Sequence, residues 1–281
     1  MEWLGVRHVP RLGYVRLREG LIPLGELRET ARHSTLGSLR RCDFALEEPL
    51  PFDVPDRARP VPVLSLPGIG WLDELPRDRS AALSGFLASW YADVPASPPP
   101  HQAPTGLPEP LRAFYEIAAQ KPVIYGRQNE IYRPDRLRLT GSDEDPTRVV
   151  FAVENQGAWE KSIDPTDDDP VVWDESEEEP EAERLSGFLL QFALAEAVFS
   201  APFTGGASIT GEQLERFAER MTPVPLRPAT FPAEHTRFYV APGLVAMAYP
   251  DDGVQLSVAS RQRSALRDLR DVGFGWDNFN G

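Results

Sequence analysis

Carboxylates are the side chains whose number and spacing come closest to a chemical site in this sequence. Glu154 and Glu160 flank a predicted turn, and Asp167, Asp168 and Asp169 follow as a run. Two carboxyl groups that face each other across a cleft act as general acid and base in glycoside hydrolysis. Clustered carboxylate oxygens instead hold Ca²⁺, and an acidic surface segment attracts basic proteins and speeds their docking. The sequence therefore offers a hydrolase, a cation site or a docking surface.

The docking interpretation is favoured over the other two. The aspartate run lacks the alternating ligands and the turn glycine of an EF-hand loop, so it is typical of a solvated loop. A glycosidase needs two carboxyl groups with divergent pKa values in a sugar-sized cleft, and the spacing of Glu154 and Glu160 does not indicate one. A carboxylate-dependent hydrolase is kept as an alternative.

Motifs of other common catalytic sites are missing. Gly206–Ser208 begins like a nucleophile elbow, but Thr210 stands where the second glycine is required. No glycine-rich phosphate loop is present, and the single cysteine, Cys42, cannot form a multi-thiolate metal site. The histidines lack the short spacing of a zinc site: His8, His33, His101 and His235. We expect no enzymatic activity, no metal and no cofactor.

The composition indicates which partners the protein binds. The chain has 281 residues, 41% of them hydrophobic, and its formal net charge is −14, which disfavours nucleic acid and favours cationic proteins. The N-terminal segment lacks the continuous apolar stretch of a signal peptide, and no segment has 18 uninterrupted apolar residues. We therefore expect a soluble, cytoplasmic protein that does not bind membranes.

The segment 148–173, RVVFAVENQGAWEKSIDPTDDDPVVW, displays these polar groups on predicted strands. An apolar run at 149–153 predicts a buried strand, which stops at Glu154, Asn155 and Gln156 before Gly157 allows a tight turn. Glu154 and Asn155 either contact a partner or bond the loop backbone so that the turn keeps its shape. Tryptophans that flank the next strands are interface anchors or core residues: Trp159 and Trp173.

The remaining elements are expected to support this segment. Apolar periodicity predicts helices over 78–91 and 107–120, and a helix that is hydrophobic nearly all round over 187–199, capped by Ser186. Further expectations are a capping box at Thr210 and Gln213, a solvated acidic loop after Trp173, and C-terminal strands over 236–240, 244–249 and 254–259. Residues 1–76 are expected to be an extension or small subdomain, with a hairpin pairing 14–17 with 21–24. This arrangement predicts an α+β fold.

The order of several segments resembles the SUKH superfamily, the relatives of the yeast cell-wall-assembly regulator, in an actinobacterial-like branch. The resemblance extends from about residue 80 to 276. It rests on these segments: LPEPLRAFYEIA, RQNEI, LRL, VVFAVENQGAWEKSIDPTDDDPVVW, LSGFLLQFALAEAVF and TRFYVAPGLVAMAYPDDGVQLSVAS. The first 76 residues lie outside it.

The resemblance implies a single α+β domain at 77–281, with one mixed or antiparallel sheet of about six strands backed by helices. Many bacterial members are described as immunity proteins that bind and neutralise toxins, often nucleases or deaminases. The family has no catalytic residues to carry over. Its most characteristic segment matches Glu154-Asn155-Gln156-Gly157, Trp159 and Asp169 to Trp173.

We therefore predict a non-enzymatic immunity protein that neutralises a cationic toxin domain by stoichiometric binding, without a cofactor. A scaffold or regulatory protein with a housekeeping partner is the alternative from another class. The predicted partner-binding residues are Glu154, Asn155, Gln156, Trp159, Asp167, Asp168, Asp169 and Trp173.

Overall fold

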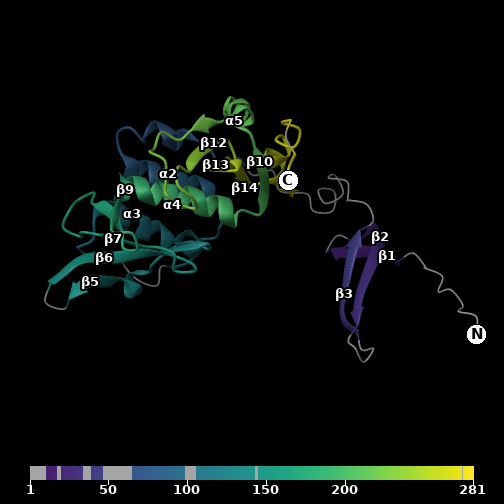
Figure 1. Cartoon of the computed structure of the whole chain (residues 1–281), viewed down its shortest axis with the longest axis horizontal. Helices are drawn as coiled ribbons and strands as arrows, with labels where there is room; N and C mark the ends of the chain where they lie inside the picture. The colour runs from purple at the N-terminus through teal and green to yellow at the C-terminus, as the bar shows by residue number, and fades with distance from the viewer. Residues whose placement is uncertain are drawn as a thin grey trace, which may run out of the picture. The chain divides into compact units, whose positions relative to one another are not determined.

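The structure is a computed structural model that describes residues 11–17, 20–33, 39–46, 65–98, 106–142, 145–273 and 275–281 (Figure 1). The chain divides into two compact units, Met1–Leu64 and Ser65–Gly281. Residues 65–76 belong to the second unit, although the sequence placed them in the extension. Trp71 and Leu75 are buried in its core, and the backbone N–H of Gly243 donates to the carbonyl of Pro67.

The first unit contains a three-stranded antiparallel sheet. Its strands, in spatial order, are β1 (Arg11–Leu17), β2 (Gly20–His33) and β3 (Leu39–Leu46). The register pairs Leu17 with Gly20 and Val15 with Ile22, which confirms the predicted hairpin. Residues 47–64, which follow β3, lie outside the described residues.

The second unit contains two antiparallel sheets of six strands each. Sheet I has the order β4 (Asn129–Ile131), β6 (Asp145–Glu154), β7 (Glu160–Ile163), β8 (Val171–Asp174) and β9 (Glu179–Arg184), and β5 (Arg138–Ser142) also pairs with β6. Sheet II has the order β11 (Thr222–Pro223), β12 (Arg237–Ala241), β13 (Leu244–Asp251), β14 (Gly253–Ser260), β10 (Phe203–Ile209) and β15 (Asn278–Phe279). The predicted α+β class is confirmed.

The α-helices form two layers, one between the two sheets and one on the outer face of sheet II. The α-helices are α2 (Arg79–Trp90), α3 (Glu109–Ala118), α4 (Leu185–Ser200), α5 (Gly211–Ala218) and α6 (Arg263–Arg267). Short 3₁₀ helices are η1 (Gly70–Asp73), η2 (Pro122–Tyr125) and η3 (Pro134–Arg136). None of the helices in the described parts of the chain is long and apolar enough to cross a membrane.

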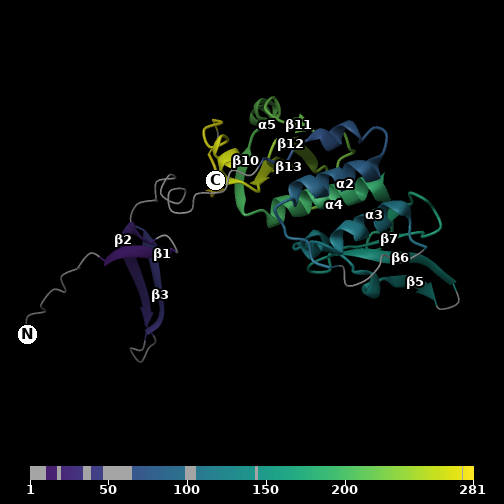
Figure 2. The same ribbon diagram turned by 180° about the vertical axis from the view of Figure 1, so that it is seen from behind.

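Helix α4 explains why there are two sheets where one was predicted. Its residues 185–198 are all buried, and its neighbours include β8 and β9 of sheet I and β13 and β14 of sheet II. Figures 1 and 2 show α4 between the sheets in both views. A helix that is apolar on every side must be covered on every side, and a single sheet covers only one side of a helix. The single-sheet prediction is therefore corrected.

Helices α2, α3 and α4 run in the same direction. At their N-terminal ends, Arg79 pairs with Glu183, which directly precedes α4. At their C-terminal ends, Lys121 after α3 donates to the carbonyl of Tyr91 at 2.6 Å. Parallel helices place their positive N-terminal dipole ends side by side, so carboxylates are favourable there and cations at the other end.

Several local predictions are confirmed in sheet II and its helices. Thr210 accepts a hydrogen bond from the backbone of Gln213, whose side chain accepts from the backbone of Thr210, so the capping box is complete. The C-terminal strands form the meander β12–β13–β14. Gly253 opens β14 with a φ of +115°, a left-handed conformation that favours glycine.

Two predictions near sheet I are wrong. The acidic run after Trp173 is a loop only in part, because its second half forms strand β9, in which Glu181 and Glu183 are buried. Ser186 does not cap α4 but lies inside it, and the N-terminal boundary residue is Arg184. Both differences arise from residues distant in the sequence. These residues supply cations to the buried glutamates and a hydrogen-bond acceptor to Ser186.

Candidate functional site

The turn between β6 and β7 is held by Glu154. One carboxylate oxygen of Glu154 accepts hydrogen bonds from the backbone N–H groups of Gln156 at 2.6 Å and Ala158 at 3.2 Å. Gly157 has a φ of +77° and donates its N–H to the Glu154 carbonyl. Of the two roles considered for Glu154, contact with a partner or bonding of the loop backbone, the geometry fits the second, because its carboxylate fixes the turn.

Asn155 and Gln156 lie at the tip of this turn and are exposed. No hydrogen bond joins either side chain to another of the described residues. Their amide groups are therefore free to bond a partner, while the backbone that carries them is fixed by Glu154.

The β8–β9 turn lies at the same end of sheet I. Consecutive turns of an antiparallel meander alternate between the two ends, and the register pairs Lys161 with Asp174 and Asp174 with Glu179. The turn is shaped by Asp174, which accepts from the backbone of Ser176 at 2.8 Å and Glu177 at 3.3 Å. Three of its exposed residues are acidic, Glu177, Glu178 and Glu179, and Ser176 is exposed as well. We call the β6–β7 and β8–β9 turns together the turn edge.

The predicted site residues do not form one surface. Asp167–Asp169 lies in the β7–β8 loop, at the opposite end of β7 from the turn edge. Strand β7 has four residues, so the two ends are separated by roughly 13 Å. Glu154, Asn155 and Gln156 are thus brought together with the β8–β9 acids and not with the aspartate run.

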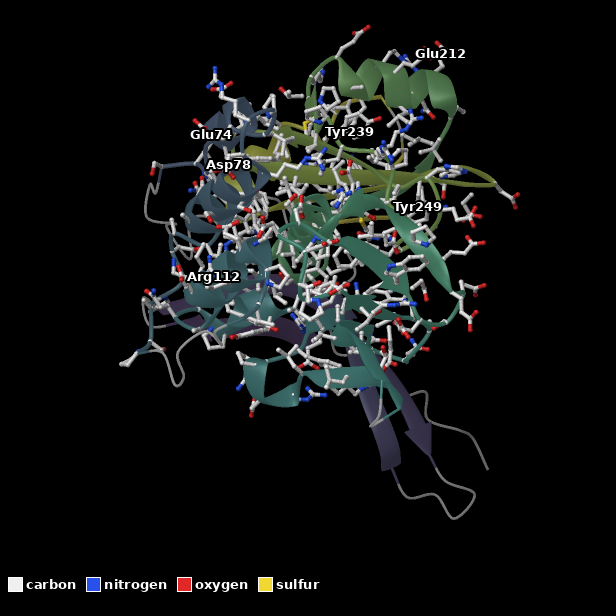
Figure 3. All side chains as sticks on the ribbon, turned by 90° about the vertical axis from the view of Figure 1, so that its left-hand side faces the viewer. Glu74, Asp78, Arg112, Glu212, Tyr239 and Tyr249 are labelled. Carbon is white, nitrogen blue, oxygen red and sulfur yellow. The ribbon has the colours of Figure 1, made fainter. Side chains whose placement is uncertain are left out.

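Asp169 bonds the first turn of helix α4. Its carboxylate accepts from the backbone N–H and the hydroxyl of Ser186, both at 2.8 Å, in the first turn of α4. Asp168 lines a hollow of about 390 Å³ at the first turns of α2, α3 and α4. Asp78 at the start of α2 and Arg112 in the first turn of α3 lie on the same side of the unit (Figure 3). The helix dipoles therefore explain why carboxylates gather here.

The two predicted tryptophans have different surroundings. Trp159 is partly buried, and its ring lies 5.8 Å from that of Phe231, so it packs against the core. Trp173 is also partly exposed, but it stands on the other face of sheet I, where the guanidinium of Arg148 lies 4.6 Å from its ring centroid. Arg148 in turn pairs with Glu175 at 2.9 Å. Trp173 is the better candidate for an interface anchor.

A buried charge cluster under the turn edge was not predicted. Lys161 is 1% exposed and forms ion pairs with Asp174 at 2.6 Å and with Glu181. Glu181 also accepts from the hydroxyl of Thr230 at 2.8 Å. The signal in the sequence was the alternation EPEAER, which directs Glu181 and Glu183 to one face of a strand.

Lys161 determines the protonation of Asp174. Burial alone would raise the pKa of the Asp174 carboxyl, but the hydrogen bond and charge of Lys161, with the N–H groups of Ser176 and Glu177, hold the pKa below its ordinary value. Asp174 therefore stays ionised and joins the buried cluster to the β8–β9 turn.

Glu154 and Glu160 do not converge as an acid–base pair. The register places Glu160 beside Val153, so strand alternation directs Glu154 to the other face of sheet I. Their partners also differ, since Glu154 bonds its own turn and Glu160 pairs with Arg138. Within the described residues, no three or more histidine, cysteine or acidic side chains converge to hold a metal ion.

A second unpredicted feature adjoins the β6–β7 turn. A hollow of about 550 Å³ is lined by the loop after η2, by β4, by η3 and by Glu154, Asn155 and Gly157 of the turn. We call it the arginine hollow, after the three arginines that line it: Arg127, Arg133 and Arg136. The signal in the sequence was the segment RQNEIYRPDRLR, which holds four arginines in an acidic chain.

Comparison of the chain with protein-family models, with curated proteins and with solved structures gave no match. The resemblance to the SUKH superfamily stays a prediction from the sequence.

Proposed function

We propose that this protein is a non-enzymatic binding protein of the immunity type, which neutralises a toxin by stoichiometric binding. The observation that carries the proposal is the turn edge. Glu154 and Asp174 accept backbone hydrogen bonds inside their own turns, and the exposed amide and carboxylate groups project from these fixed backbones. A surface ordered before binding loses little conformational entropy on binding, which favours affinity.

The charge of the turn edge suits a cationic partner. Glu177, Glu178 and Glu179 are exposed there, and the chain as a whole has a net charge of −14. A toxin that binds nucleic acid phosphates must carry a basic active site, and opposite charges steer two proteins together. A nuclease or deaminase acting in the cytoplasm is therefore the partner class that we propose, in line with the resemblance to SUKH proteins.

The experiment is co-expression with the toxin encoded by a neighbouring gene, read out as growth rescue and as capture of a one-to-one complex. Two double variants, Asn155→Ala with Gln156→Ala and Glu177→Gln with Glu178→Gln, alter the turn edge. We expect each to weaken binding by about tenfold, the effect of one lost charge-assisted hydrogen bond.

The matched control is Asp167→Asn with Asp168→Asn, which removes the same charge from exposed residues at the opposite end of sheet I. This variant is expected to bind the toxin as the wild type does. If the Glu177/Glu178 variant and the Asp167/Asp168 control lose the same binding affinity, the net charge of the protein determines binding, and not the turn edge. Capture of a housekeeping protein in place of the toxin would contradict the proposal.

A further inference from the structure

The arginine hollow is built on a fixed loop. The buried carboxylate of Glu196 on α4 accepts the backbone N–H groups of Arg127 at 2.6 Å, Gln128 at 3.0 Å and Asn129 at 2.7 Å. Gly126 turns the chain into this loop at a φ of +110°, where an added Cβ would lie 1.9 Å from the carbonyl oxygen of Asn129. The loop amides therefore point inward, and the backbone that carries Arg127 cannot shift freely.

The charged groups of the hollow differ in what they bond. Arg136 donates twice to Glu130, at 2.6 and 2.8 Å, and Glu154 is occupied by its own turn. Arg127 and Arg133 are exposed, and neither forms an ion pair with a described residue. Two cations of the hollow thus lack an ion-pair partner among the described residues. The chain has 43 acidic and 29 basic residues, so carboxylates are the more abundant charged groups.

Aromatic rings hold part of this charge in place. The guanidinium of Arg133 lies 5.6 Å from the ring centroid of Tyr125, and that of Arg136 lies 4.7 Å from the ring centroid of Tyr132. Both tyrosines are buried, so the rings are fixed. Cation–π contacts limit the rotamers of an arginine while its N–H groups stay free to donate.

We infer that the arginine hollow receives a carboxylate from an acidic segment of the protein partner, with Arg127 and Arg133 donating to it. This inference rests on the proposed function, since it describes a second part of the same interface. Planar guanidinium groups bind carboxylates through paired N–H donors. A phosphate is a poorer fit, because phosphate sites use clusters of backbone amides and those of 127–129 are taken by Glu196.

Because of the position of the hollow, the interface has a basic part beside an acidic part. Across this end of sheet I, the order is β4 with the hollow, then the β6–β7 turn, then the acidic β8–β9 turn. The β6–β7 turn is shared, because Asn155 lines the hollow. A partner that fits has an acidic segment next to a basic surface, and a uniformly basic protein leaves Arg127 and Arg133 unpaired.

The test uses the purified full-length protein and a fluorescently labelled, capped hexapeptide of alternating Asp and Glu, followed by fluorescence anisotropy. The buffer has physiological ionic strength, at which charges more than about 8 Å away are largely screened. We expect saturable binding that the double variant Arg127→Gln with Arg133→Gln weakens by about tenfold. Arg127→Lys with Arg133→Lys keeps the charge but loses the paired donors, so several-fold weakening is expected.

The control is Arg112→Gln, which removes one charge from an exposed residue in the first turn of α3, whereas the hollow begins at Pro122, after the C-terminal end of α3. It should bind the peptide within about twofold of the wild type. Absence of saturable binding, or equal binding by the arginine double variant, would overturn the inference. Displacement of the peptide by inorganic phosphate at lower concentration than by acetate would overturn the assignment to a carboxylate. The proposed function fails separately, in the toxin co-expression experiment.

Discussion

Replacing Lys161 by methionine tests whether the buried charge cluster stabilises the second unit. The side chains of Lys161 and Glu181 are 1% and 3% exposed, and that of Asp174 is 16% exposed. Methionine preserves most of the apolar length of the lysine stem, so little empty volume is created. The main loss is the cation, which leaves two carboxylates without their charge partner.

The structure sets the expected size of the effect. Removing one partner of a buried ion pair costs about 3–5 kcal/mol, because the other charge stays buried without compensation. Asp174 keeps the N–H groups of Ser176 and Glu177, and Glu181 keeps the hydroxyl of Thr230. These remaining bonds place the expected cost at the lower limit, about 3 kcal/mol. That is a large share of the roughly 5–15 kcal/mol that stabilises a typical domain.

The assay is urea unfolding at pH 7, followed by tryptophan fluorescence. The signal reports mainly on the second unit, because five of the six tryptophans lie in it: Trp71, Trp90, Trp159, Trp173 and Trp276. The expected result is a lower midpoint with an unchanged slope. The control is Lys121→Met at the other lysine of the chain, which loses one hydrogen bond to the carbonyl of Tyr91 and is expected to cost about 1 kcal/mol.

A triple variant separates charge from packing. Lys161→Met combined with Asp174→Asn and Glu181→Gln removes all three charges, and neutral replacement of a whole buried cluster is often tolerated. We expect it to be more stable than Lys161→Met alone. A cost below about 1 kcal/mol for Lys161→Met would refute the reasoning, since it would mean that water compensates the carboxylates. A triple variant no more stable than Lys161→Met would assign the loss to packing.

Three further predictions concern stability. Asp169→Ala is expected to cost about 1–2 kcal/mol in urea unfolding, because Ser186 loses its acceptor at the start of α4, whereas Asp167→Ala, an exposed residue, should stay within about 0.5 kcal/mol. Thr210→Ala removes half of the capping box and should cost about 1 kcal/mol, seen as a melting temperature lower by about 2–4 °C. The lowered pKa of Asp174 contributes stability that is complete above about pH 4 and is lost as the pH falls through the folded-state value. Asp174→Asn should therefore flatten the acid limb of the stability–pH curve, and an unchanged limb would contradict the assignment.

Helical elements could be predicted because their signal is local. In α3, Leu111, Phe114, Tyr115 and Ala118 follow the helical period, and all four are buried in the core. The apolar residues around all sides of α4 likewise predicted burial. The number of sheets did not follow from these patterns, because strand periodicity does not say which strands pair.

The errors near the site have two different causes. Strand β9 was missed because the alternation EPEAER places acidic rather than apolar residues on its buried face, and Glu181 is stable there only beside Lys161 from another strand. The separation of the aspartate run from the β6–β7 turn could have been predicted. Two consecutive connections of an antiparallel meander lie at opposite ends of the sheet, whatever their side chains are.

The position of α4 between the two sheets also sets an order of events during synthesis. The helix ends at Ser200, and the last strand that covers its second face, β14, ends at Ser260, about 60 residues later. At roughly 5–20 residues per second, ribosomes need about 3–12 seconds to make this interval. During that time sheet I is complete but one face of a strongly apolar helix has no cover. The nascent chain therefore passes through an aggregation-prone intermediate, and the second unit closes only when its C-terminal meander has emerged.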